Sequence, residues 1–206
     1  MTSASDFDTN MFKDFSWTPA NATEAAVILG RYPEARAASA IIPLLHLAQY
    51  QVAAATGRAW LPGPVIEYVA KQIGMPNIRA MEVATFYTMF NLKPVGRFHV
   101  QVCGTTPCML RGSGDLLRAC KDKGLAKGAV TNDGLFTLTE VECLGACANA
   151  PMVQINDDNY EDLTYDSMTA ILDALARGET PKSGSAIGRQ ASCPEDGATT
   201  LKEFVS

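Results

Sequence analysis

The sequence lacks the charge pattern of a nucleic-acid-binding protein. Its 206 residues carry 17 Lys and Arg against 22 Asp and Glu, a net charge of -5, and no run of five basic residues occurs. A sequence-independent grip on phosphates needs clustered Lys and Arg, so this balance argues against nucleic acid as a partner.

Long apolar runs and targeting signals are also missing. The most apolar stretch, ASAIIPLLHLAQY (38–50), is shorter than the roughly 18 residues of a membrane span and contains Pro43 and His46. The start, MTSASDFDTNMFKDF, is acidic and resembles neither a secretion signal nor an Arg-rich transit peptide. We therefore expect a cytosolic protein with no direct membrane insertion, whose 6 cysteines are ligands or free thiols rather than disulfides.

Changes in hydrophobic period divide the chain into an arm, two folded regions and a tail. Residues 1–18 have no period and are expected to form a flexible arm. Residues 19–94 repeat apolar residues at steps of three and four, which predicts a helical bundle. Residues 95–178 follow the order β–α–β–β–β–α, which predicts an α+β domain. Residues 179–206, rich in Gly, Ser, Thr and Pro, are expected to form an extended tail.

The last predicted helix of the bundle is NIRAMEVATFYTMF (77–90). It places Val83, Phe86, Tyr87 and Phe90 on one face at helical spacing. Core packing is the default interpretation of this face, and contact with another protein of a complex is the alternative.

Four of the cysteines form two close pairs. CGTTPC contains Cys103 and Cys108, CLGAC contains Cys143 and Cys147, and each pair directly follows a predicted strand. Neighbouring strands would bring both loops to the same end of a sheet, and with them four thiols. Four interpretations remain open on spacing alone: free core thiols, disulfides, a structural zinc site and an iron–sulfur cluster.

The residues beside the paired cysteines favour the cluster. Its sulfur atoms need N–H donors and close backbone approach, which the small residues Gly104 and Gly145 permit. We expect an apolar collar around it from Met109, Leu144 and Met152.

The remaining cysteines and the histidines carry weaker signals. Cys120 lies on a predicted helix and is expected to be a core thiol, while Cys193 lies in the tail as an accessible thiol. His46 and His99 each stand alone, so we expect structural roles for both.

Longer motifs resemble a known family. VCGTTPC and ECLGACANAPM are similar to the thioredoxin-like [2Fe-2S] ferredoxin domain. EVATFYTMFNLKPVGRFHVQVC, SAIIPLLHLAQ and the tail motif GRQASCPEDG resemble the E subunit (24 kDa) family of NADH:quinone oxidoreductase, respiratory complex I. The resemblance implies an α+β fold, with an N-terminal helical bundle followed by a thioredoxin-like [2Fe-2S] domain. It also implies that one [2Fe-2S] cluster is held by four ligands: Cys103, Cys108, Cys143 and Cys147.

The resemblance further implies partners and a location. The E subunit of this family docks on the F subunit, which binds FMN and NADH, among other peripheral-arm subunits on the cytoplasmic side of the bacterial inner membrane. This chain would be the electron-transfer subunit of a proton-translocating enzyme, exchanging one electron with FMN. No G-x-G-x-x-G follows a predicted strand, so we expect no complete active site here.

Two other functions remain open. One is a diaphorase-module subunit of an NAD-reducing hydrogenase or formate dehydrogenase, and the other is a zinc-stabilised interaction module. The polar tail is expected to wrap the F subunit, so that deleting residues 180–206 would weaken assembly and leave the cluster unchanged.

Overall fold

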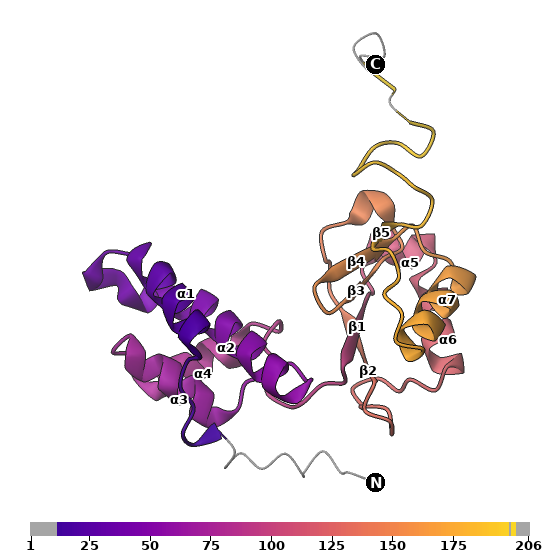
Figure 1. The fold of residues 1–206 in the computed structure, drawn as a ribbon. Helices are drawn as coiled ribbons and strands as arrows, with labels where there is room; N and C mark the ends of the chain where they lie inside the picture. Colours follow the sequence, from indigo (N-terminus) through magenta and orange to yellow (C-terminus); the bar gives the residue numbers. More distant parts are fainter. Residues whose placement is uncertain (1–11, 198, 201–206) are drawn as a thin grey trace. The chain divides into compact units, whose positions relative to one another are not determined.

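The computed structural model describes residues 12–197, 199 and 200, and its contacts divide the chain into two units. The first unit is Met1–Arg97 and the second is Phe98–Ser206 (Figure 1). Each has its own hydrophobic core. No helix in the described part of the chain is both long and apolar enough to cross a membrane. The expected segment boundaries at residues 18, 94 and 178 stay predictions.

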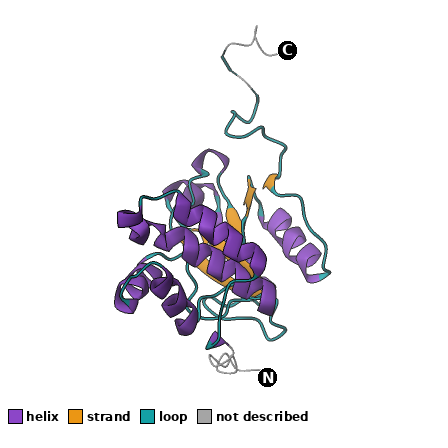
Figure 2. Cartoon of the chain, turned by 60° about the vertical axis from the view of Figure 1, so that its left-hand side comes forward, coloured by secondary structure: helices purple, strands orange, loops and turns teal. Residues whose placement is uncertain are grey.

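The first unit is helical, as its period predicts. It contains α1 (Pro19–Gly30), α2 (Ile41–Thr56), α3 (Gly63–Gln72) and α4 (Asn77–Phe86), with a 3-10 segment η2 (Glu34–Ala40) before α2 (Figure 2). These helices enclose a core whose largest fully buried side chains include Leu44, Leu45, Leu61, Ile66, Val52, Val65 and Val69.

Residues expected to belong to the flexible arm contribute to this core. Phe12 is buried, and its ring lies edge-on to Trp60 with a centroid distance of 5.9 Å. The indole N–H of Trp17 donates to Gln72 Oε1 over 2.7 Å. Aromatic burial explains this difference, which corrects the expectation for residues 12–18. Residues 1–11 of the expected arm lie outside the described residues.

The predicted apolar face of residues 77–90 is divided by an early helix end. Tyr87 has extended backbone angles, φ -89° and ψ 111°, so α4 ends at Phe86. The chain then turns, and Phe90 is buried with its ring 4.9 Å from that of His46. Phe86 is 77% exposed. Core packing is therefore correct for Phe90 and wrong for Phe86, because a single helical face no longer carries both.

The second unit is built on a five-stranded sheet in the order β2-β1-β3-β4-β5. The strands are β1 (Phe98–Cys103), β2 (Phe136–Val141), β3 (Val153–Ile155), β4 (Asp158–Glu161) and β5 (Gly184–Ser185). β1 runs parallel to β2 and antiparallel to β3, β3 is antiparallel to β4, and β4 is parallel to β5. β5 falls within the expected tail, and the sequence pattern did not predict it.

Helices cover this sheet and close its core. They are α5 (Thr106–Arg111), α6 (Ser113–Asp122) and α7 (Tyr165–Ala176), with a 3-10 turn η3 (Cys147–Asn149). α6 and α7 lie side by side along the sheet (Figure 1). Together with the strands they bury Val100, Val102, Leu116, Cys120, Leu138, Val153, Met168 and Leu172. The predicted α+β class, with helices first and the sheet domain second, is confirmed.

The start of α7 is capped by Thr164. The Thr164 hydroxyl accepts from the Ser167 N–H, and the Ser167 hydroxyl accepts from the Thr164 N–H. This reciprocal pair satisfies two N–H groups that the first turn would otherwise leave free.

Candidate metal centre

Two parallel strands deliver both cysteine loops to one edge of the sheet. In the β1–β2 register Cys103 lies opposite Val141, so Cys143 follows two residues beyond the matching strand end. The Gly104 N–H donates to the Val141 carbonyl over 2.9 Å, which continues the pairing into the first loop. This arrangement confirms the expectation that neighbouring strands bring the two cysteine pairs to the same end.

The first pair is buried. Cys103 ends β1 and Cys108 lies on α5, and each is 1% exposed. They share a small apolar cluster with buried Ala150 and Met152, against which Leu144 and Ala146 pack. The expected collar is thus present at Leu144 and Met152. It is wrong for Met109, which is 59% exposed and is not among the side chains that pack against this cluster.

The second pair is exposed. The Sγ atoms of Cys143 and Cys147 are 3.3 Å apart, and the Gly145 N–H donates to Cys143 Sγ over 3.4 Å. Gly145 has a φ of 88°, which a residue with a Cβ adopts only under strain. In a tetrahedral site with metal–sulfur bonds of about 2.3 Å, two sulfurs lie about 3.8 Å apart. The pair is therefore close to the separation of two ligands on one metal ion.

Within the first pair, the two thiols have opposite pKa shifts. Burial raises the pKa of Cys108 to about 11, and its interaction with Cys103 adds to the rise. Burial opposes ionisation of Cys103 too, but hydrogen bonds with Thr105 and with the Leu144 backbone lower its pKa overall. The Thr105 hydroxyl lies 3.3 Å from Cys103 Sγ. Cys103 is therefore the readier thiolate of this pair.

The second pair repeats this asymmetry. The Gly145 N–H, followed by the hydrogen bond with Cys147, lowers the pKa of Cys143. The same Cys143 contact raises the pKa of Cys147. The charge of Cys103 opposes ionisation of both Cys143 and Cys147, and the charge of Cys147 opposes ionisation of Cys108. Ionisation of the two pairs is thus linked.

The donor set consists of two pairs. In the described residues, no group of three or more His, Cys, Asp or Glu side chains is arranged to hold a metal ion. A [2Fe-2S] cluster takes four Cys thiolates, two on each iron, so it needs two pairs of cysteine ligands. The residues present fit that requirement, and the assignment of the four cysteines as its ligands stays a prediction.

An acidic side chain lies over the first loop. A Cβ placed on Gly104 would come 2.8 Å from Glu140 Oε1. The Glu140 carboxylate also forms an ion pair with Lys127 Nζ. A Cβ at position 104 would therefore displace the Glu140 side chain, a constraint that the sequence argument for close backbone approach to sulfur did not include.

The other singled-out residues have structural surroundings. Cys120 is buried in the core, and burial raises its pKa to about 12, as expected of a core thiol. His99 is buried with Nε2 2.9 Å from Thr139 Oγ1, and burial lowers its pKa to about 4. His46 stacks on Tyr50, with 6.2 Å between the ring centroids. Cys193 is partly exposed.

Sequence reasoning missed three polar residues beside the second loop. Asn149 is 3% exposed, and the side chains of Asp162 and Arg189 are 4% and 8% exposed. Asn149 donates to a carbonyl 42 residues along the chain, and Arg189 donates to Asp162 across 27 residues. No spacing or period signals contacts between segments so far apart.

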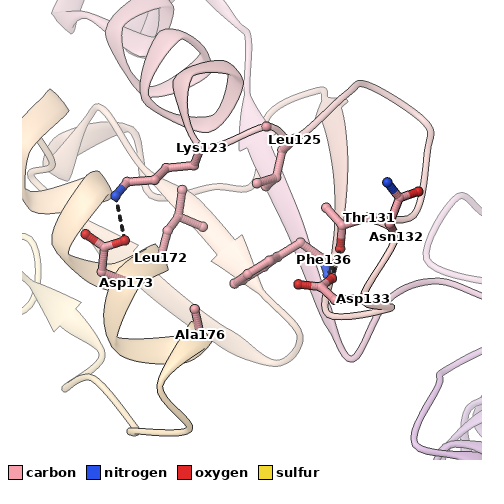
Figure 3. Close-up of a pocket in the computed structure, with 10 residues that line it drawn as sticks. Lys123, Leu125, Thr131, Asn132, Asp133, Phe136, Leu172, Asp173 and Ala176 are labelled. Atoms are coloured by element: carbon pink, nitrogen blue, oxygen red, sulfur yellow. Dashed lines mark hydrogen bonds and ion pairs between the residues drawn. The ribbon is translucent and has the colours of Figure 1, made fainter.

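A surface pocket of the second unit lies apart from the cysteine loops. Its volume is about 350 Å³, and an ion pair of 2.6 Å joins Lys123 and Asp173 at its lining (Figure 3). Leu125, Phe136 and Leu172 supply its apolar surface. None of the four paired cysteines lines it, so it is not part of the candidate metal centre.

Comparisons with known proteins match most of the chain. The thioredoxin-like [2Fe-2S] ferredoxin family matches residues 25–176, a range that includes both cysteine pairs. The E subunit of NADH-quinone oxidoreductase from Rickettsia bellii (strain RML369-C) is 57% identical over 163 residues, 79% of this chain and 95% of the relative. The corresponding protein of Rickettsia conorii (strain ATCC VR-613 / Malish 7) is 56% identical over the same shares.

A solved structure shares the fold at low identity. The crystal structure of an NAD+-reducing [NiFe]-hydrogenase in the air-oxidized state aligns with a TM-score of 0.55 and 18% identity. The alignment covers 67% of this chain and 23% of the hydrogenase chain. This similarity supports the fold alone, and the family match confirms that the second unit is a thioredoxin-like [2Fe-2S] domain.

Proposed function

Because this chain belongs to the E subunit family of NADH-quinone oxidoreductase, we propose that it exchanges one electron with the FMN of a neighbouring NADH-binding subunit. A subunit of an oxidoreductase complex with an electron-transfer role is the general function that family membership supports. The observation that carries the finer proposal is the convergence of two cysteine pairs at the ends of parallel strands β1 and β2.

The residues around the pairs suit a one-electron site. A [2Fe-2S] cluster, when bound, supplies one-electron chemistry, and the proposed ligands are Cys103, Cys108, Cys143 and Cys147. Met152 and Ala150 exclude water from the first pair, while the second pair faces solvent. Gly145 directs an N–H at Cys143 Sγ, which favours its thiolate form. One side of the site is thus protected, and the other is open to a partner.

Exposed apolar side chains beside Cys108 support docking of that partner. Met109 and Leu110 follow Cys108 on α5 and are 59% and 76% exposed. Large exposed apolar side chains next to a functional site are typical of an interaction surface. We propose that this surface contacts the F subunit, which binds FMN and NADH, in the peripheral part of complex I on the cytoplasmic side of the bacterial inner membrane.

Cysteine substitutions test the ligand set. The full chain is purified without oxygen, and its iron, acid-labile sulfide, zinc and visible absorption are measured. Replacing any one of the four paired cysteines with serine is expected to remove most of the iron and the visible band. Cys193→Ser, outside the pairs, serves as the control and keeps both. A colourless protein that holds zinc would contradict the cluster and favour the zinc-stabilised interaction module.

Co-expression with the flavin-binding subunit of the same organism tests the partner. Leu110→Ala is expected to weaken the complex without changing the iron content, because Leu110 is exposed and is not a ligand. Val27→Ala, an exposed apolar residue of the first unit, is the matched control. Equal affinities for the two variants would contradict the proposed surface.

A second candidate function is that of an electron-transfer module of an NAD-reducing hydrogenase, or of a related formate dehydrogenase. The fold shared with the hydrogenase structure fits this alternative. Isolation of the native complex distinguishes the candidates. Quinone reduction by NADH supports the first function, and hydrogen- or formate-dependent reduction of NAD supports the second.

A further inference from the structure

The C-terminal segment folds back onto the domain that holds the cysteine loops. Strand β5 pairs with β4, with Gly184 opposite Tyr160 and Ser185 opposite Glu161. The Ala186 N–H then donates to the Glu161 carbonyl over 2.9 Å. Gly184 and Ser185 thus extend the sheet, and residues 184–193 are hereafter called the C-terminal clasp. This pairing corrects the expectation of an extended tail for this segment.

A buried ion pair anchors the clasp. Arg189 donates to Asp162 through Nε over 3.0 Å and through Nη2 over 2.7 Å. The Ser185 hydroxyl donates to the same carboxylate over 2.6 Å. The two charged side chains are only 8% and 4% exposed. Removing one of them would leave the other as an uncompensated buried charge, so this pair holds the clasp in one place.

The same anchor reaches the second cysteine loop. The Asp162 N–H donates to the Asn149 carbonyl over 2.8 Å, at the end of the turn that starts at Cys147. The Asn149 side chain donates to the Ala191 carbonyl over 2.8 Å and to Glu161 Oε2 over 2.6 Å. The loop is therefore tied to the clasp at Asn149 and Ala191, and to the anchor of the clasp at Asp162.

We propose that the C-terminal clasp holds the second cysteine loop in its ligand-ready conformation, with Arg189 as a positioning residue. Cys143 and Cys147 are exposed, and this loop packs on the cluster of the first pair only through the partly buried Leu144 and Ala146. Hydrogen bonds from outside the loop add to that limited packing. This proposal rests on the proposed function, because a fixed conformation of the loop prepares Cys143 and Cys147 to bind only if they are ligands of the cluster.

This proposal changes the expected result of a tail deletion. Deleting residues 180–206 removes Arg189 and the Ala191 carbonyl, so it is expected to loosen the second loop as well as any partner contact. Truncation after residue 193 keeps both. The two truncations therefore separate the clasp from the rest of the tail.

Hydrogen–deuterium exchange of the metal-free full chain tests the clasp without the cluster. Arg189→Gln is expected to speed amide exchange in residues 143–151 at least tenfold, and to leave strand β1 unchanged. Arg177→Gln is the matched control, because Arg177 forms a similar two-bond pair with Glu179 on the surface. Asn149→Ser removes the donor to Ala191 with the buried charges still paired, so it tests the same link if Arg189→Gln fails to fold.

The electron paramagnetic resonance spectrum of the reduced, loaded protein gives a second measurement. A changed line shape in Arg189→Gln, and an unchanged one in Arg177→Gln, is expected if the loop positions its ligands. Exchange rates equal to the control in both Arg189→Gln and Asn149→Ser would overturn the clasp, whatever the metal content. If the wild-type chain holds zinc or no metal, the proposed function is overturned. The exchange rates would still show whether the clasp holds the second loop.

Discussion

The two cysteine loops of this protein are held in different ways. The first pair is buried in a small apolar cluster with Ala150 and Met152. The second pair is exposed, and its loop is held by the Gly145 N–H and by hydrogen bonds between Asn149 and distant segments. One candidate site thus combines a buried half stabilised by packing with an exposed half in which polar contacts add to the partial packing of Leu144 and Ala146. Substitutions of the two kinds should therefore have different effects.

Truncating Met152 is expected to have the largest effect on stability. Met152 is 1% exposed beneath the first pair, so Met152→Ala should lower the free energy of unfolding by about 2–5 kcal/mol. Leu144→Ala, in a partly buried position, should cost less. Urea unfolding of the metal-free chain followed by circular dichroism measures both.

Tryptophan fluorescence gives an internal control for Met152→Ala. Both tryptophans, Trp17 and Trp60, lie in the first unit. The urea midpoint followed by tryptophan fluorescence should therefore be the same in Met152→Ala and in the wild type. Equal losses for Met152→Ala and Leu144→Ala would contradict the contrast between a buried and a partly exposed side of the site.

The strand pair β1–β2, which carries both cysteine loops, should give an effect of intermediate size on the dependence of stability on pH. His99 on β1 meets Thr139 on β2, and burial lowers its pKa to about 4. Its unfolded pKa is about 6.5, so the unfolded chain binds the proton first as pH falls. Stability should therefore decrease by about 2 kcal/mol between pH 7 and pH 5, and by about 3 kcal/mol once pH reaches 4.

The matched variant for this pH test is His99→Gln, which cannot titrate. Its urea unfolding should lose the part of the pH dependence that His99 contributes. An identical pH slope in wild type and His99→Gln would show that His99 does not cause it.

The smallest expected effects come from the two loop glycines. Gly104→Ala brings a Cβ against Glu140, and Gly145→Ala meets no atom within 4 Å but has a φ of 88°. Gly145→Ala should cost about 1 kcal/mol through backbone strain, and Gly104→Ala should cost less, because the Glu140 side chain can shift away from the added Cβ. In a Glu140→Ala background the cost at Gly104 should disappear, while the cost at Gly145 should remain. Double-mutant cycles by urea unfolding measure this, and equal costs in both backgrounds would remove the distinction.

Much of the fold follows from hydrophobic period and helix-ending residues. The four helices of the first unit, strands β1 to β3, and helices α6 and α7 were predictable from their apolar residues, and β4 from the turn residues before it. The helix α5 and the strand β5 were missed, since both are short and contain few residues that report a period. The early end of α4 was also missed, because the backbone angles of Tyr87 depend on Phe90 turning into the core.

By itself, the sequence determined the family, the α+β class and the two cysteine pairs. Short spacing and strand period are local properties, so they can be read without a structure. Only the tertiary structure decided which pair is buried, and that Asp162, Asn149 and Arg189 join the second loop to the C-terminal clasp. Those contacts span 42 and 27 residues, and hydrogen bonds between distant segments leave no periodic trace in the residues between them.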